Sequence, residues 1–166
     1  VYMNAGAYGG EIRQVCSQVT VLTRNGEKKI LSNGEMGFSY RHSALEDTGD
    51  IVLSARFALT PDTENAIRER MKELMAKRSA SQPLDMPSAG SAFKRPVGGY
   101  AAALIDGAGL KGFAVGGAAI STKHAGFAVN LGGATAADVR GLLSQVSDRV
   151  FAQTGIRLEP EVRIIR

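Results

Sequence analysis

The spacing of the apolar residues changes along this chain, and the order of the changes limits the folds that it can adopt. Residues 15–23 are rich in β-branched residues in partial alternation, which is typical of a strand. Asn25-Gly26 is a hairpin signal, so residues 28–31 are expected to return antiparallel, and Asn33-Gly34 marks a second turn. Residues 51–59 alternate again, with one face expected to carry Ile51, Leu53, Ala55, Phe57 and Leu59. The first third therefore predicts part of an antiparallel sheet.

Helical spacing follows this strand-rich region. Thr60 is expected to cap a helix that has Pro61 in its first turn and a highly charged outer face. The apolar stripe of that helix is formed by Ile67, Met71, Leu74 and Met75. A shorter helix is expected over residues 99–108, ended by Gly109.

The last third combines strands with one long helix. Residues 113–121 and 126–130 are expected to form paired strands, and residues 156–165 a last strand. Between them, residues 135–138 fit a capping box with Asp in place of Glu, and Gly155 is a suitable stop. The helical spacing is carried by Val139, Leu142, Leu143, Val146 and Val150. This order of elements indicates an α+β fold and not a doubly wound parallel sheet.

Composition and charge exclude several classes of function. The 166 residues carry 20 basic and 16 acidic side chains, a net charge of +4 without a long basic run, which disfavours nucleic acid and fits an acidic small molecule. Cys16 is the single cysteine, so no internal disulfide forms, as expected in a reducing cytoplasm, and we expect it to be buried in a strand. No apolar run approaches the ~18 residues of a membrane span, and no metal-ligand spacing occurs.

The segment 87–96 (Pro-Ser-Ala-Gly-Ser-Ala-Phe-Lys-Arg-Pro) is the richest in chemical groups. Ser91 carries a proton that can be given or taken, and Lys94 supplies positive charge beside it. Arg95 can hold a phosphate or a carboxylate through two parallel hydrogen bonds. The alternative is a Gly-Ser turn with a solvated basic edge, and this segment alone does not separate the two interpretations.

Two earlier segments could also bind a ligand. The glycines of residues 4–10 allow a close approach of the backbone to a flat or phosphorylated ligand, or they simply form a turn that enters a strand. In residues 38–43, Arg41 could stabilise negative charge on a carboxylate or an enolate, or it could be a surface side chain stacked on Tyr40. His42 is interpreted as an exposed loop residue rather than a base.

Two later segments remain equally open. Small residues lead into Lys123 and His124 between two expected strands, which fits either a contact with phosphates or a hairpin with a solvated tip. Glu159 and Glu161 lie two residues apart on the expected last strand, with Pro160 bending the chain between them. A carboxylate paired with an arginine is a common way to tune an acid, and exposed charges at a strand edge are the alternative.

These segments, in this order, resemble the UDP-N-acetylenolpyruvoylglucosamine reductases (the MurB family), and the resemblance runs essentially end to end. Single motifs are weak, but the whole series in register is highly specific. The Lys-Arg-Pro at 94–96, and the lack of a substrate-capping insertion, are similar to the shorter subtype of the family. The matching segments are Asn-Ala-Gly-Ala-Tyr-Gly-Gly-Glu at 4–11, Tyr-Arg-x-Ser at 40–43, Gln-Pro-Leu at 82–84, Pro-Ser-Ala-Gly-Ser-x-Phe-Lys-Arg-Pro at 87–96, Ala-Gly-Leu-Lys-Gly at 108–112, Gly-Gly-Ala at 116–118, Lys-His-Ala-Gly-Phe at 123–127 and Leu-Glu-Pro-Glu-Val-Arg at 158–163.

The resemblance implies a reaction of bacterial peptidoglycan synthesis, and thus roles in cell wall biogenesis, cell shape and cell division. NADPH reduces bound FAD, and hydride then passes to UDP-N-acetylglucosamine enolpyruvate, giving UDP-N-acetylmuramate. By motif, Ser91 is the proton donor, and Arg41 and Glu161 hold the substrate carboxylate and stabilise the enolate. Glu161 either donates a proton to the enolate oxygen or, if ionised, orients Arg41. Further substrate contacts are implied for Tyr40, Lys94, Arg95 and His124, and the flavin is expected to be lined by Asn4, Gly6, Ala7, Tyr8 and Gly9.

The resemblance also implies a domain organisation. Residues 1–61 correspond to the C-terminal part of the FAD-binding domain, residues 62–80 to a connecting helix, and residues 81–166 to the substrate-binding domain. The polar stretch 79–87, which holds two prolines, is the expected boundary. Because the chain starts at Val1, in the middle of a motif, an N-terminal FAD-binding domain is expected upstream.

Two rival functions stay open. One is a truncated fragment that binds the UDP-sugar without catalysis, since hydride transfer needs the flavin. The other is a diverged flavin oxidase of similar fold, which the joint presence of Ser91, Arg41 and Glu161 disfavours.

Overall fold

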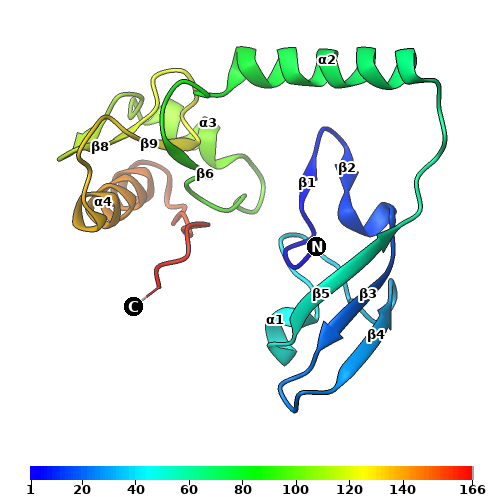
Figure 1. Ribbon diagram of the computed structural model, residues 1–166. Helices are drawn as coiled ribbons and strands as arrows, with labels where there is room; N and C mark the ends of the chain where they lie inside the picture. Colours follow the sequence, from blue (N-terminus) through cyan, green and yellow to red (C-terminus); the bar gives the residue numbers. More distant parts are fainter. Residues whose placement is uncertain (166) are drawn as a thin grey trace. The chain divides into compact units, whose positions relative to one another are not determined.

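The computed structural model describes residues 1–165 and contains two compact units (Figure 1). The first unit comprises residues Val1–Met71, and the second begins at Lys72. The dividing line falls inside helix α2 (Glu64–Ser81), whereas the sequence predicts domain limits near the two ends of this helix. The functional division into domains stays a prediction.

The first unit is built on a three-stranded antiparallel sheet. β3 (Cys16–Leu22) lies between β4 (Lys28–Ser32) and β5 (Ile51–Phe57), which confirms the expected hairpin and the later third strand. At the hairpin turn, Gly26 has φ +80° and Thr23 N–H donates to the Glu27 carbonyl at 2.9 Å. A smaller hairpin, β1 (Gly6–Ala7) with β2 (Gly10–Glu11), precedes the sheet and continues into the 3₁₀ turn η1 (Ile12–Gln14).

The core of this unit forms on one face of the sheet, under the short helix α1 (Leu45–Thr48). Burial of Cys16 confirms the sequence interpretation, and loss of hydration raises the pKa of its thiol. The fully buried or nearly buried core residues are Cys16, Val19, Val21, Leu31, Met36 and Leu45.

The face predicted for β5 is wrong for Ile51 and Leu53, which are 62% and 47% exposed. The core takes Val52, and Ala55 is the member of the predicted face that packs against it. The cause is a register shift between β3 and β5: Thr20 pairs with Ser54, whereas the next residue of β3 pairs with Val52. One extra residue in a strand reverses the inward and outward positions, so no single alternation runs through β5. Leu59 lies beyond the end of the strand.

Helix α2 starts later than the sequence predicts. Its first residue is Glu64, and Thr63 Oγ1 accepts a hydrogen bond from Ala66 N–H at 3.4 Å, so the hydroxyl of Thr63 occupies the capping position expected for Thr60. Pro61 thus precedes the helix. The expected apolar stripe is present but not buried, and Met71 is 66% exposed. The structure describes every residue of α2, and none of them is buried.

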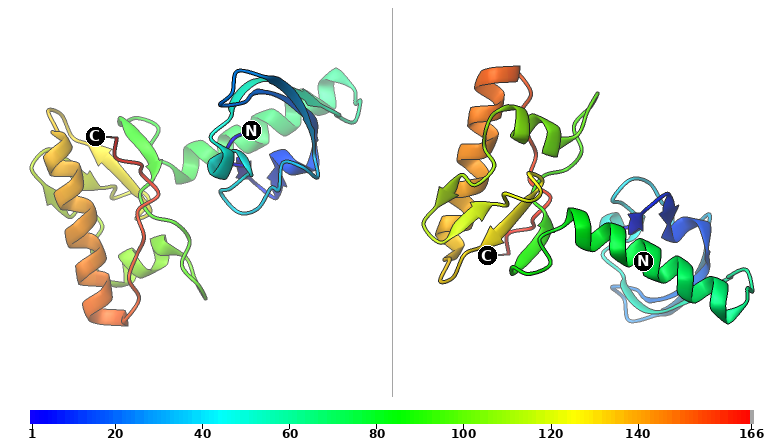
Figure 2. Two further views of the ribbon diagram at one scale, coloured as in Figure 1. Left: turned by 90° about the horizontal axis from the view of Figure 1, so that it is seen from below. Right: turned by 90° about the horizontal axis from the view of Figure 1, so that it is seen from above.

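The second unit contains two helices and a four-stranded antiparallel sheet of order β6-β9-β8-β7. Its long C-terminal helix, orange in Figure 2, packs against β8 and β7. The strands are β6 (Ser88–Ser91), β7 (Ala114–Val115), β8 (Ala118–Ile120) and β9 (Phe127–Asn130). α3 (Ala101–Gly107) and α4 (Ala136–Thr154) supply the other side of the core. The largest fully buried side chains here belong to Ile105, Ile120, Leu142, Val146 and Val150. The mixture of helices and antiparallel sheets confirms the α+β class.

Two strand predictions in this unit need correction. Residues 113–121 form two short strands because Gly116 adopts φ +55° and turns the chain between β7 and β8. Residues 156–165 form no strand in the described structure, and their pairing is limited to one isolated bridge between Phe93 and Pro160. Proline has no N–H to give to a ladder, which is why the segment is extended but not a regular strand.

The predicted start and end of the last helix are confirmed. Asp138 N–H donates to Thr135 Oγ1 at 3.1 Å, and Thr135 N–H donates to Asp138 Oδ2 at 2.9 Å, which completes the capping box. These bonds, first of all that from the Thr135 backbone, hold the pKa of Asp138 below its ordinary value of 3.8. Their stabilisation is therefore present above that value and is lost as the pH falls through the lower folded pKa. Gly155 ends the helix with φ +71°.

A bulge interrupts β6 directly before Ser91. Ser88 pairs with Val129 and Ser91 with Phe127, so β6 advances three residues while β9 advances two. Gly90 has φ +90°, a region that a residue with a side chain rarely adopts. The Ser88 hydroxyl stabilises the bulge, because it donates to the Ala128 carbonyl at 2.6 Å and accepts from Gly90 N–H at 3.2 Å.

Over residues 1–165, no helix has both the length and the apolar character required to cross a membrane.

We predict that Thr135→Ala lowers the free energy of unfolding of the second unit by about 1 kcal/mol, because the first turn of α4 loses its cap. The measurement is hydrogen exchange of the α4 amides under native conditions. Thr135→Ser, which keeps the hydroxyl, is the control. Equal exchange in the two variants would contradict a capping role.

We also predict that Gly90→Ala destabilises the second unit by about 1–3 kcal/mol, the cost of forcing a side chain into a left-handed conformation. Gly99→Ala is the matched control, because Gly99 has no positive φ and an added Cβ would meet no atom within 4 Å. The control is expected to stay within about 0.5 kcal/mol of the unsubstituted chain. Exchange of the β9 amides reports both values, and similar losses in the two variants would argue against strain at the bulge.

Candidate functional site

The β1–β2 hairpin forms one wall of a pocket in the first unit. Tyr8 and Gly9 form the hairpin turn with φ +51° and +81°, the left-handed values that a tight two-residue turn requires. The pocket has a volume of about 230 Å³. Enclosed ligand sites measure roughly 300–1,000 Å³, so this pocket can hold only part of a large ligand. Its lining consists of Asn4, Gly6, Ala7, Tyr8, Gly9, Gly10, Glu11, Tyr40 and Arg41.

The opposite wall of the pocket is the turn that carries Tyr40 and Arg41. Ser39 and His42 close this turn through two backbone hydrogen bonds of 3.2 and 3.3 Å. Arg41 has φ +54°, and its guanidinium lies 5.3 Å from the centre of the Tyr40 ring. The structure thus brings Arg41 and Tyr40 together with all the residues predicted to line a flavin.

His42 ends this turn, and its imidazole lies close to two carboxylates. Its Nδ1 lies 2.8 Å from Glu46 Oε2, and its Nε2 lies 3.7 Å from Asp47 Oδ2. The imidazole is about one-third exposed, so His42 lies in a loop as predicted but is half-buried rather than exposed.

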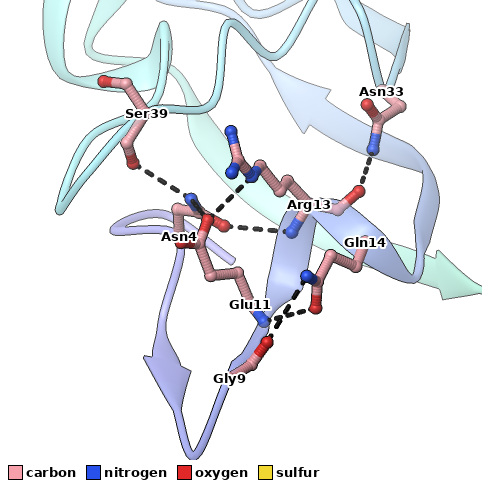
Figure 3. A network of polar contacts seen from close by, with 7 residues as sticks. All are labelled: Asn4, Gly9, Glu11, Arg13, Gln14, Asn33 and Ser39. Atoms are coloured by element: carbon pink, nitrogen blue, oxygen red, sulfur yellow. Dashed lines mark hydrogen bonds and ion pairs between the residues drawn. The ribbon is translucent and has the colours of Figure 1, made fainter.

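A network of polar contacts joins the hairpin to the body of the unit (Figure 3). The Glu11 carboxylate pairs with Arg13 at 2.8 Å, and Glu11 N–H donates to Gln14 Oε1 at 2.9 Å. The Asn33 amide donates to the Arg13 and Cys16 carbonyls at 2.8 and 2.7 Å. Gly10 and Glu11 also line the pocket and were not predicted as site residues, although both belong to the motif at residues 4–11 that carries the family resemblance.

In the second unit, Ser91 lies where β6 ends and the chain turns inward. Ser91 is exposed, whereas the next two residues, Ala92 and Phe93, are buried at 0% and 4% exposure. Phe93 belongs to the hydrophobic core of the second unit. A buried anchor directly after an exposed serine fixes the position of that serine's backbone.

The C-terminal segment runs beside this anchor and carries Glu161. Glu161 N–H donates to the Ala92 carbonyl at 3.0 Å, and Lys94 N–H donates to the Glu159 carbonyl at 2.8 Å. The Lys94 ammonium also pairs with the Glu159 carboxylate. Ser91, Lys94 and Glu161 are therefore held on two adjacent segments that are far apart in the sequence.

His124 approaches the same region from the turn between β8 and β9. Its ring contacts that of Phe127, the residue paired with Ser91, with 4.9 Å between the ring centroids. His124 Nδ1 accepts a hydrogen bond from Gly126 N–H at 3.1 Å, so a neutral ring carries its proton on Nε2. The hydroxyl of Ser121, which is buried, accepts from the N–H groups of Lys123 and His124 and holds the turn.

Arg95 is directed to its own loop in this structure. Its guanidinium lies 4.0 Å from the centre of the Tyr100 ring, and its Nε donates to the Gly99 carbonyl at 3.3 Å. A ligand contact by Arg95 stays a prediction. The catalytic set expected from the sequence is divided between the units, because Arg41 belongs to the first, and Ser91 and Glu161 to the second.

The glycines at 116–117 have a packing explanation. A Cβ on Gly117 would lie 2.7 Å from the Ala134 backbone nitrogen, and one on Gly116 would lie 2.4 Å from the Asp138 carboxylate. Close packing against Asp138 and Ala134 therefore accounts for both glycines.

A second pocket, of about 390 Å³, lies beside the β6 bulge and was not predicted. Its signal in the sequence was weak, since small residues such as Ala118, Ala128 and Ala134 are equally common in close packing. Among residues 1–165, no group of three or more His, Cys, Asp or Glu side chains could hold a metal ion.

Comparison with known proteins agrees with this geometry. The family described as "UDP-N-acetylenolpyruvoylglucosamine reductase, C-terminal domain" matches residues 82–165. UDP-N-acetylenolpyruvoylglucosamine reductases of Latilactobacillus sakei and Agathobacter rectalis are 53% and 54% identical to 99% of this chain. The chain covers 54% and 52% of those two proteins, so it spans about half the length of the curated relatives it matches.

A solved structure agrees as well. The crystal structure of UDP-N-acetylenolpyruvylglucosamine reductase from Thermus caldophilus is similar over 98% of this chain and 58% of its own, with a TM-score of 0.82 and 40% identity. Together with the family match and the high identity to the named relatives, this likeness places the chain in the UDP-N-acetylenolpyruvoylglucosamine reductase family.

Proposed function

We propose that this chain is the part of a peptidoglycan-precursor reductase that supplies the proton donor and the substrate-carboxylate site. The whole protein would use NADPH and FAD to reduce UDP-N-acetylglucosamine enolpyruvate to UDP-N-acetylmuramate in the cytoplasm. One observation carries the proposal: an exposed serine at a β-bulge lies next to a buried anchor, and a carboxylate-bearing segment is hydrogen-bonded to that same anchor.

The first-unit pocket fits a contact with part of FAD. Its hairpin wall presents backbone and small side chains, and an added Cβ on Gly9 would meet no atom within 4 Å, so a flat or phosphorylated group has room there. Gly6, Ala7, Tyr8 and Gly9 would hold the cofactor from this side. When bound, FAD supplies the hydride that is added to the substrate carbon remote from the carboxylate.

In this scheme Ser91 completes the reduction. Its hydroxyl gives a proton to the carbon next to the carboxylate, so that hydride and proton together convert the carbon–carbon double bond into a single bond. The serine regains a proton from water afterwards. A serine hydroxyl is a weak acid, so the rate depends on a fixed position, which the Gly90 bulge and the buried Phe93 support.

Arg41 and Glu161 stabilise the enolate that precedes this proton transfer. The Arg41 guanidinium holds the substrate carboxylate through charge-assisted hydrogen bonds. Glu161 either donates to the enolate oxygen or orients Arg41, depending on its protonation. Tyr40, Lys94, Arg95 and His124 are proposed to contact the rest of the UDP-sugar. This assignment keeps residues 1–61 as part of the FAD-binding domain, 62–80 as a connecting helix and 81–166 as the substrate domain.

We predict that Ser91→Ala leaves the oxidation of NADPH intact and slows the reoxidation of the reduced enzyme by substrate by roughly 10²–10⁴-fold, the usual contribution of a general acid. Stopped-flow absorbance of the cofactor measures both half-reactions in a protein of the full length of its relatives. Ser144→Ala, which removes an exposed hydroxyl from α4 in the same unit, is the control. Unchanged reoxidation in Ser91→Ala would remove Ser91 from the mechanism.

We further predict that Glu161→Gln slows the same half-reaction, by roughly 10²-fold, because a group that stabilises the enolate is lost. Glu159→Gln is the matched control. It lies two residues away and pairs with Lys94, so it should change mainly the affinity for the substrate. An effect of Glu161→Gln on NADPH oxidation alone would contradict the assignment.

A further inference from the structure

Asn4 is buried at the base of the β1–β2 hairpin, with 2% of its surface exposed. Its amide makes three hydrogen bonds within the protein. Nδ2 donates to Glu11 Oε2 at 2.9 Å and to the Ser39 carbonyl at 3.0 Å, while Oδ1 accepts from Arg13 N–H at 3.0 Å (Figure 3). The partners fix the orientation of the amide, because a carboxylate and a carbonyl can only accept and a backbone N–H can only donate.

The bond to Ser39 anchors the turn that carries Arg41. The Ser39 carbonyl accepts from Asn4 and, across the turn, from His42 N–H at 3.3 Å. On the other flank, the buried hydroxyl of Ser43 donates to the Tyr2 carbonyl at 2.6 Å. The N-terminal segment therefore holds both sides of the turn.

The conformation of this turn needs such support. Arg41 has φ +54°, a left-handed conformation that costs a non-glycine residue free energy and persists only when its surroundings enforce it. Asn4 itself has φ +44°, which asparagine tolerates better than most residues. The Asn4 side chain also contacts Glu11, whose carboxylate pairs with Arg13, so one amide connects the hairpin to the Arg41 turn.

We propose that Asn4 is a positioning residue for Arg41: its amide fixes the backbone of the 39–42 turn relative to the β1–β2 hairpin. Its relevance to catalysis rests on the function proposed above for Arg41. The proposal differs from a direct contact with the cofactor, since the hydrogen bonds that the Asn4 amide makes are directed to protein atoms.

Asn4→Gly tests the proposal in the 166-residue chain. Glycine accepts the positive φ, so the substitution removes the amide without adding backbone strain. Hydrogen exchange of the Ser39 and His42 amides, which close the turn, is expected to accelerate about tenfold. The Arg41 side-chain resonances should also lose the ring-current shift that arises from its position over Tyr40.

Asn33→Ala is the matched control. The Asn33 amide also donates to two backbone carbonyls in the same unit, but those belong to Arg13 and Cys16 and not to the turn. Comparison of the two variants therefore removes the effect of a general loss of stability. Equal acceleration at Ser39 and His42, or an unchanged Arg41 spectrum in Asn4→Gly, would overturn the proposal.

Asn4→Asp tests whether the Asn4 amide nitrogen is the donor to Glu11 and Ser39, because it replaces that donor by an acceptor. Asn4→Asp has nearly the same shape, but its carboxylate would face the Glu11 carboxylate and the Ser39 carbonyl. We expect faster exchange in the turn than in Asn4→Gly at neutral pH, and a recovery as the pH falls and the carboxylates take up protons. A pH-independent spectrum of the turn in this variant would contradict the assigned donors.

The unsubstituted chain provides a measurement that does not depend on the folding of any variant. A through-hydrogen-bond coupling between Asn4 Nδ2 and the Ser39 carbonyl carbon is expected, and its absence would refute the contact. A double-mutant cycle in the full-length reductase adds the link to catalysis, because Asn4→Gly should add little to the effect of Arg41→Lys on the substrate half-reaction. Full additivity would count against action through Arg41. An inactive unsubstituted reductase would instead refute the proposed function and leave the exchange results intact.

Discussion

The pairing of residues 92–94 with residues 159–161 is the contact on which the proposed chemistry of the second unit depends. It consists of two backbone hydrogen bonds, which together form the bridge between Phe93 and Pro160, and Phe93 belongs to the core. Phe93 and Leu158 are both buried, so neither segment can move without opening the core. Ser91 directly precedes this pairing, and Glu161 is part of it, because Glu161 N–H makes one of the two hydrogen bonds. A serine that donates a proton must have a fixed position, and a backbone directly beside a rigid contact provides one.

In the first unit, the turn that carries Arg41 is also held in place, but by hydrogen bonds and not by apolar packing. The turn that carries Arg41 has little hydrophobic support, since Tyr40 is 56% exposed. Its backbone is held by side-chain hydrogen bonds from Asn4 and Ser43, both of which are buried. Buried polar groups without partners are costly, so a fully satisfied set specifies one arrangement more sharply than apolar packing does. The second unit thus uses an apolar anchor, and the first unit a polar one.

The sequence predicted those elements whose signals are local. The capping box at Thr135, the stop at Gly155 and the hairpin at Asn25-Gly26 each involve residues within a few positions of one another, and all are confirmed. The predicted face of β5 and the last strand are wrong because their outcome depends on distant partners. A register shift against β3 reverses β5, and Pro160 limits the C-terminal segment to one bridge. The same limit applies to the site: its residue types were visible in the sequence, but the contacts that hold Asn4, Phe93 and Glu161 were not.

The glycines illustrate why residue type alone cannot separate a ligand site from a structural one. Gly9 and Gly90 have positive φ and open space beside them, so their backbones can be approached by a ligand. Gly116 also has positive φ, but the space beside it is filled by Asp138, the residue that completes the α4 capping box. In the sequence, Gly9, Gly90 and Gly116 all lie in runs of small residues. Residue type alone therefore predicts a ligand contact at each of them equally. The distinction comes from what lies within 4 Å of the missing side chain: the backbone is open to approach at Gly9 and Gly90, whereas protein atoms fill the space beside Gly116.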